Sequence, residues 1–416
     1  MHEVYIPRIQ RGDTCFAANV LGARGPLLSA LVHFFEHGRW GSLVVTSIEG
    51  QSLTAEDKLF ILMQAGLYLS ATRGMGAPEA GICYGCAEPL CHSLNQPRLL
   101  SMALMGQYRY SLHTDKLPRA MQIAERLYLL AREQNDAGLM LGAYANCATT
   151  FYFLGEFETA RQYARHGVQL WRSGRVQSYA EDYLTPVVSC LIYWAMSEWH
   201  FGEIASCHAL MDEAISIAKE LKDMSSLALA LSFAAALAYF ERDPAEVDRF
   251  ASELIELSTR QNFVLWLAHA ESYRGWARSA LGKPVEGISW IEQGIRDYRT
   301  TDTVLGLPTH LARKAEALHQ AGRTSEALEA INEVEALAER FENRYWCAEL
   351  HRLRGVFLTA MSADNTEIEA SFSAAIRIAR EQKSISLEKR AEATYAEYRR
   401  QKASASGARG FRLRLC

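Results

Sequence analysis

The chain has 416 residues, of which 49% are hydrophobic and 22% charged, a composition typical of a globular protein. Its formal net charge of −4 argues against a basic surface that binds nucleic acid or an anionic membrane. Nine irregularly spaced cysteines argue against a disulfide scaffold. The sequence contains no run of about 18 apolar residues, so we predict no membrane span. We therefore expect a cytoplasmic protein that contacts neither nucleic acid nor membrane directly.

Residues 1–50 show little helical periodicity, and we predict an irregular N-terminal segment there. The stretch also lacks a basic region followed by a continuous apolar core, which argues against a signal peptide. Strand-like alternation is almost confined to "SLVVTSI" at 42–48.

From about residue 54 onward, apolar residues recur with the 3.6-residue period of an α-helix. Short breaks recur at intervals of 47, 41, 39 and 40 residues, and a small residue stands seven positions before each break. The breaks are Gly155, Gly202, Asp243, Gly282 and Gly322, and the small residues are Ala148, Ala195, Ala236, Gly275 and Ala315. This regularity predicts an all-α, right-handed superhelix (α-solenoid) of about seven to eight antiparallel helix pairs within residues 51–400.

Four glycines lie within residues 271–298, although each costs up to about 1 kcal/mol in a helix interior. Small residues allow two helix axes to approach closely. We therefore expect Gly275 and Gly287 at the crossing of one hairpin, Gly282 in its turn, and Gly294 facing the next hairpin.

Residues 145–170 resemble the tetratricopeptide repeat in their order of small and aromatic residues. The matching positions are Ala148, Phe151, Gly155, Phe157 and Ala160. Residues 311–337 carry a second clear copy, whereas Asp243 and Asp248 depart from the pattern in the third unit. The resemblance implies helical hairpins, with helices longer than those of the standard 34-residue repeat.

Three stretches, 53–94, 226–263 and 345–401, resemble the C-terminal repeat region of large bacterial regulators. In that family a cyclase-type or winged-helix DNA-binding domain and an ATPase precede the repeats. No phosphate-binding G-x-x-x-x-G-K-[ST] motif occurs in this chain. The resemblance therefore implies the repeat module of a regulator, with an ATPase, cyclase or DNA-binding domain as a possible partner.

The segment "CYGCAEPLCH" places Cys83, Cys86, Cys91 and His92 close together, with the C-x-x-C spacing of zinc ligands. No second ligand pair accompanies them, and cysteines on one helical face commonly pack in a core. The histidines fall in no H-E-x-x-H context, and no G-x-S-x-G motif occurs. We favour core packing over a metal site, and expect neither a catalytic centre nor a cofactor.

In tetratricopeptide arrays, the residues one and four positions after the small residue face the concave groove. Mapped onto this chain, those positions are Thr149, Tyr152, Met196, Trp199, Leu237, Phe240, Trp276, Ser279, Glu316 and His319. Five of them are our candidate partner-binding residues: Tyr152, Trp199, Phe240, Trp276 and His319. Tyrosine and tryptophan are frequent anchors of protein interfaces. The alternative is that these rings fill gaps between the helices.

Residues 401–416 form a basic, non-periodic tail that we expect to be disordered. We interpret the whole chain as a non-enzymatic module that binds a protein or peptide in a signalling or transcriptional assembly. The alternative is the regulatory fragment of a nucleotide-using enzyme, an ATPase or an adenylate or guanylate cyclase, whose catalytic domain lies outside this sequence.

Overall fold

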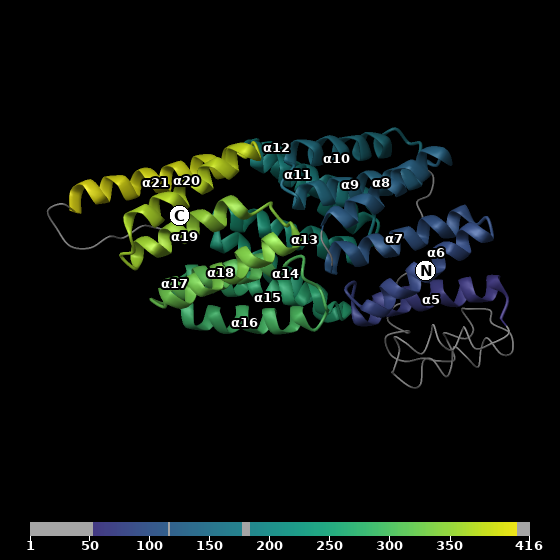
Figure 1. Ribbon diagram of the computed structural model, residues 1–416, viewed down its shortest axis with the longest axis horizontal. Coiled ribbons are helices and arrows are strands. Elements are labelled where there is room, and N and C mark those ends of the chain that lie inside the picture. The colour runs from purple at the N-terminus through teal and green to yellow at the C-terminus, as the bar shows by residue number, and fades with distance from the viewer. Residues whose placement is uncertain (1–52, 115–116, 177–183, 406–416) are drawn as a thin grey trace. The chain divides into compact units, whose positions relative to one another are not determined.

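The computed structural model describes residues 53–114, 117–176 and 184–405, which form seventeen α-helices and no strand (Figure 1). The prediction of an all-α helical array is thus confirmed. The alternating stretch 42–48, the rest of residues 1–52 and the tail from 406 lie outside the described residues. Helix α21 includes residues 401–405, which we had assigned to the tail.

Contacts between Cα atoms divide the chain into two units. Unit 1 comprises Met1–Asp115 and Thr301–Val304, and unit 2 comprises Lys116–Thr300 and Leu305–Cys416. The helices of unit 1 are α5 (Ala55–Arg73), α6 (Pro78–Ser93) and α7 (Pro97–Thr114). Those of unit 2 are α8 (Leu117–Glu133), α9 (Ala137–Phe153), α10 (Phe157–Arg172), α11 (Pro186–Phe201), α12 (Ile204–Glu220), α13 (Met224–Glu241), α14 (Pro244–Gln261), α15 (Val264–Ala280), α16 (Pro284–Arg299), α17 (Leu307–Gln320), α18 (Thr324–Phe341), α19 (Cys347–Ala360), α20 (Asn365–Glu381) and α21 (Ile385–Ala405).

Unit 1 packs its three helices around the buried ring of Tyr84 on α6. Gly66 on α5 and Gly106 on α7 leave room for this ring. A Cβ atom would lie 2.8 Å from the Tyr84 ring at Gly66 and 2.4 Å from it at Gly106. The segment Thr301–Val304 joins this unit through a hydrogen bond from Val304 N to His113 O (2.8 Å).

Unit 2 is a stack of helix pairs in which the odd-numbered helices lie inside. Each odd-numbered helix from α9 to α19 contacts the next odd-numbered helix, and the series ends at α21. The even-numbered helices from α10 to α20 pack outside this series. Helix α13 is long and apolar enough for a membrane span, but 83% of its residues are buried within the protein, as in a core helix.

The inner series of unit 2 closes on itself, because α21 contacts α11 as well as α19. Ser386 Oγ donates to Trp199 O (2.5 Å), and Ser384 Oγ lies 2.7 Å from His200 Nδ1. The connector before α19 also reaches back, with a hydrogen bond from Arg344 N to Phe153 O (2.9 Å). The connector before α19 and helix α21, from the last part of unit 2, therefore cover the inner side of α9 and α11, from its first part.

The glycines of α15 and α16 let this hairpin pack backbone against backbone. A Cβ atom at Gly275 would lie 2.6 Å from Gly287 O, and one at Gly287 would lie 2.3 Å from Gly275 O. Gly282 has φ +87 in the turn, so these three predictions are confirmed. The prediction for Gly294 is wrong: it packs against Ala268 of its own hairpin, because the close approach extends along both helices.

Replacing Gly287 by alanine should lower the free energy of unfolding by about 1–3 kcal/mol, because the added methyl overpacks the crossing. The methyl would meet backbone of α15, which cannot move without separating the pair. Urea unfolding followed by tryptophan fluorescence measures this, since seven of the eight tryptophans belong to unit 2. Ser289→Ala, at an exposed position of the same helix, is the control and should change stability little. Equal stability of the two variants would contradict the tight crossing.

Candidate functional site

The four aromatic residues expected to line a groove are buried in unit 2. The exposed fractions of Tyr152, Trp199, Phe240 and Trp276 are 0%, 2%, 2% and 3%. The expectation that they present an open surface is therefore wrong. Their part in binding a partner remains a prediction, and a partner could touch them only if covering segments moved.

The chain itself covers these rings. Tyr345 lies against Tyr152 with ring centroids 5.3 Å apart, and Trp346 stacks on Phe240 at 4.2 Å. Trp199 in turn contacts Phe240 at 4.8 Å. The assignment to inner helices was right, but the turn before α19 occupies the space that an open solenoid would leave to solvent.

The fifth candidate, His319, is half-buried near the end of α17. Its Nδ1 lies 3.1 Å from Thr324 Oγ1, and its ring centroid is 4.9 Å from that of Phe357. Burial lowers the pKa of His319, although Glu316 opposes the shift. The imidazole thus makes contacts within its own hairpin and with the next helix.

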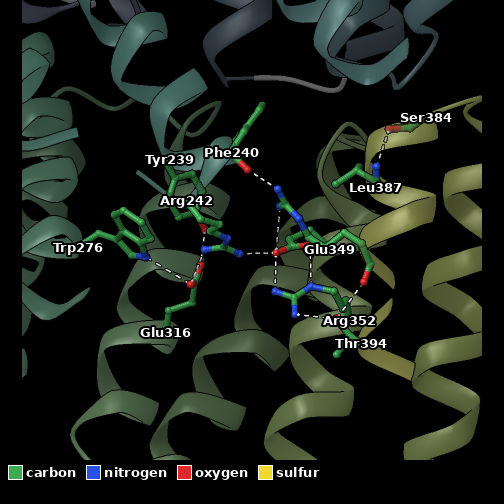
Figure 2. Close-up of polar contacts among 11 residues, drawn as sticks. Tyr239, Phe240, Arg242, Trp276, Glu316, Glu349, Arg352, Ser384, Leu387 and Thr394 are labelled. Carbon is green, nitrogen blue, oxygen red and sulfur yellow. Dashed lines mark hydrogen bonds and ion pairs between the residues drawn. The ribbon is translucent and has the colours of Figure 1, made fainter. Parts of the chain in front are cut away.

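An arginine–glutamate network lies beside the aromatic residues (Figure 2). It is made of the buried Glu316, Glu349 and Arg352 and the partly exposed Arg242 and Arg390. Its five charged side chains come from α17, α19, α21 and the residue that follows α13. They converge because the inner helices meet where the series closes.

Glu316 forms one half of the network. It accepts hydrogen bonds from Arg242 Nη1 (2.6 Å), Tyr239 Oη (2.5 Å) and Trp276 Nε1 (3.3 Å). Trp276, which we had assigned to a binding groove, thus anchors a buried carboxylate (Figure 2).

Glu349 forms the other half, and three arginines surround it. Arg352 donates to both carboxylate oxygens at 2.9 and 2.7 Å, and Arg242 Nη2 donates at 2.5 Å. Arg390 Nη1 lies 3.5 Å from Oε1 of Glu349, while its Nη2 donates to the main-chain oxygen of Phe240. Arg242 therefore bridges the two carboxylates, as Figure 2 shows.

The electrostatics of the network follow from burial and pairing together. Burial alone would raise the pKa of Glu349, but Arg352, Arg390 and Arg242 hold that pKa far below its ordinary value. Burial lowers the pKa of Arg390 to about 10 against the opposing effect of Glu349. The carboxylate of Glu349 is thus fixed in its charged form and suits binding and orientation rather than proton transfer at neutral pH.

Arg242 reaches the network from the turn between α13 and α14, where it adopts φ +63. Four other turns within helix pairs have a glycine at positive φ (Gly155, Gly202, Gly282 and Gly322), and the turn between α19 and α20 has Ser362 there. Asp243, which seemed to replace a turn glycine, is instead the N-cap of α14 and accepts from Ala245 N and Glu246 N. The weak third repeat is thus the place where a charged side chain is directed inward.

Sequence reasoning mapped Glu316 to a groove-facing position without selecting it as a site residue, and it missed the other charges. Arg313 lies one turn before Glu316, and Glu349 and Arg352 lie on the corresponding face of α19, all of them buried. Extending the groove-facing stripe by one or two turns toward each N-terminus would have found these three. Arg242 carries no such signal, because it lies in a turn.

The cysteine-rich segment lies in α6 of unit 1. Cys83 and Cys91 are buried, in agreement with core packing, whereas Cys86 is only half-buried. Burial raises the pKa of Cys83 to about 12, which keeps it a thiol. Among the residues described by the structure, no group of three or more His, Cys, Asp or Glu is placed to hold a metal ion.

Comparisons with known proteins show what the chain is similar to. No protein-family model matches it. An uncharacterized protein of Rhizobium meliloti (strain 1021) is 24% identical over 203 residues, which are 49% of this chain but only 20% of that relative.

Among solved structures, a Rap protein complexed with competence and sporulation factor aligns with a TM-score of 0.51 and 13% identity, over 86% of this chain and all of that one. Aspartyl phosphate phosphatase F from Bacillus subtilis aligns with a TM-score of 0.50 and 12% identity, over 90% of this chain and 94% of that one. At these identities the likeness concerns the fold alone. The chain has a tetratricopeptide-like helical-repeat fold.

Proposed function

We propose that the chain is a non-catalytic cytoplasmic module that binds a protein or peptide within a signalling or transcriptional regulatory assembly. The observation that carries this proposal is the convergence of charged and aromatic side chains from successive inner helices of unit 2. Solenoids present such inner faces to extended partners. The similar Rap structure contains a bound competence and sporulation factor, which supports a binding role for this architecture.

A second candidate is a regulatory part of a nucleotide-using enzyme. The matched region makes up only 20% of the Rhizobium meliloti relative, so in that protein it belongs to a much longer chain. An ATPase, cyclase or DNA-binding domain, on the same chain or on a partner, would then receive the signal from the repeats.

Cross-linking and affinity purification of the tagged full chain from the organism that encodes it test the proposal. Each captured protein is then purified, and its direct binding is measured by titration calorimetry. We expect at least one direct complex with a dissociation constant of about 10 μM or tighter, equivalent to roughly −7 kcal/mol.

The same calorimetry with Mg-ATP and Mg-GTP tests whether the chain itself has a nucleotide site. The captured proteins separate the two candidates, because a directly bound ATPase or cyclase would favour the second. The proposed module should bind neither nucleotide. Nucleotide binding by the purified chain, or failure of every captured protein to bind directly, would contradict the proposed function.

A further inference from the structure

Arg313 on α17 is fully buried but has no carboxylate partner in the described part of the chain. Its Nε donates to Ser272 Oγ (2.9 Å), whereas Nη1 and Nη2 have no hydrogen-bond partner among the described residues. The guanidinium carbon lies 4.0 Å from the ring centroid of Tyr273 and 5.7 Å from that of Tyr239. These contacts support a cation but leave two hydrogen-bonding groups unused.

An arginine in this position is an electrostatic anomaly. Buried charges are normally paired, and arginine cannot lose its proton in a protein to escape the cost. The neighbouring carboxylates Glu316 and Glu349 are already shared by Arg242, Arg352 and Arg390. The other arginines thus engage both carboxylates, and Arg313 has no anionic partner among the described residues.

Other unpaired polar atoms lie in the same inner part of unit 2 as Arg313. Tyr152 Oη, Trp346 Nε1 and Arg242 Nε are buried without a hydrogen-bond partner in the described part of the chain. Ring contacts link these groups, because Tyr345 touches both Tyr152 (5.3 Å) and Trp346 (6.2 Å). Trp346 is 5.9 Å from Tyr239, on which the Arg313 guanidinium lies. Unpaired donors thus lie in an aromatic surrounding, in which His310 Nδ1 and Asn343 Oδ1 also lack a hydrogen-bond partner among the described residues.

We propose that Arg313 binds the carboxylate of an apolar organic acid or of a peptide C-terminus on the inner face of unit 2. The two Nη groups of a guanidinium match the two oxygens of a carboxylate, and the surrounding rings suit an apolar chain. This inference rests on the proposed function, since it names the chemistry that the inner face recognises.

Entry to this site requires the turn before α19 to move. Tyr345 and Trp346 cover the aromatic residues, and Arg344 N and Tyr345 N hold the turn to Phe153 O at 2.9 and 3.2 Å. The network beside it is not sealed, because the side chains of Arg242 and Arg390 are 12% and 14% exposed.

Thermal unfolding of the full chain with matched acid and amide probes tests this assignment. The probes are N-acetylleucine and its amide, and a random hexapeptide mixture with a free or an amidated C-terminus, all at equal ionic strength. Near saturation, a free-acid probe should raise the melting temperature by about 3 °C or more, whereas its amide should not. A shift with N-acetylleucine identifies an organic acid as sufficient, and a shift with the hexapeptide acid alone identifies a peptide C-terminus.

Arg313→Met and Arg313→Lys locate the effect. Without ligand, Arg313→Met should melt no lower than the wild type, because it removes an unpaired buried charge. Arg313→Met should also lose the rise in melting temperature with the free-acid probe. Arg313→Lys keeps the charge but not the two parallel Nη donors, so it should bind the free-acid probe at least about tenfold more weakly. The control Arg249→Met, at an exposed arginine paired with Glu246 on α14, should retain the full response.

Three results would overturn the carboxylate site: equal effects of acid and amide on the wild type, an undiminished response in Arg313→Met, or a lower melting temperature of unliganded Arg313→Met. A protein partner that binds the wild type and Arg313→Met equally would remove this inference but leave the proposed function standing. Binding of N-acetylleucine, with no protein or peptide partner found, would support the carboxylate site but contradict the proposed function.

Discussion

Glu349→Gln should lower the free energy of unfolding of unit 2 by about 3–5 kcal/mol, because it removes one charge from a buried network. Glutamine has nearly the same shape, so packing is preserved while Arg242, Arg352 and Arg390 lose the carboxylate that they share. Arg242 would then keep Glu316, whereas Arg352 and Arg390 would have no carboxylate partner among the described residues. Urea unfolding followed by tryptophan fluorescence reports this change in unit 2.

Glu246→Gln is the matched control for this variant. Glu246 also pairs with an arginine, Arg249, but both side chains are nearly half exposed on α14. An exposed pair contributes about 0–1 kcal/mol, so the control should remain close to the wild type. If Glu349→Gln costs no more than Glu246→Gln, the network does not hold the inner helices together.

The pH dependence of the free energy of unfolding is a second test of the same network. Since the pKa of Glu349 is lower in the folded protein than its ordinary value of 4.5, the folded state favours the charged form. Its contribution is therefore complete above pH 4.5 and is lost as pH falls below 4.5 toward the folded pKa. Below pH 4.5 the wild type should lose stability more steeply than Glu349→Gln, so that the two converge.

The helix pairs could be predicted from the sequence because their determinants are local. Gly275 and Gly287 lie twelve residues apart on two helices joined by a short turn, so spacing alone placed them at the crossing. Gly294 needed more than spacing. Whether it faces its own hairpin or the next depends on how far the close approach continues along the helices.

The closure of the inner face could not be predicted, because it joins residues far apart in the sequence. Ser386 and Trp199, or Trp346 and Phe240, meet only after the pitch of the whole stack has brought α21 and the turn before α19 back to α11 and α13. Repeat spacing predicts neighbours in a stack but not its pitch. The sequence therefore indicated inner-facing aromatic residues without showing that the chain covers them.

Trp276→Ala and Trp199→Ala should each lower the free energy of unfolding by about 3–5 kcal/mol, the usual cost of truncating a buried tryptophan. Trp276 also donates to Glu316, and Trp199 packs against Phe240 and under the Arg390 guanidinium. Both variants therefore create a cavity, and the first also weakens the charged network. Thermal and urea unfolding measure both effects.

Trp290→Ala is the control that removes a tryptophan from a less buried position. Trp290 is half-exposed on α16, with Arg274 above its ring. This control should cost distinctly less than either inner variant. Trp276→Phe keeps most of the ring but removes the hydrogen bond to Glu316, so it should lie between Trp276→Ala and the wild type.

These measurements also decide between the two interpretations of the inner aromatic residues. With a partner identified by the purification described above, a groove role requires binding to weaken about tenfold or more at an almost unchanged melting temperature. A packing role requires a large fall in melting temperature, which their exposed fractions of 2% and 3% lead us to expect. A stable Trp276→Ala variant would mean that the turn before α19 leaves this ring accessible in solution, and it would restore Trp276 to the binding surface.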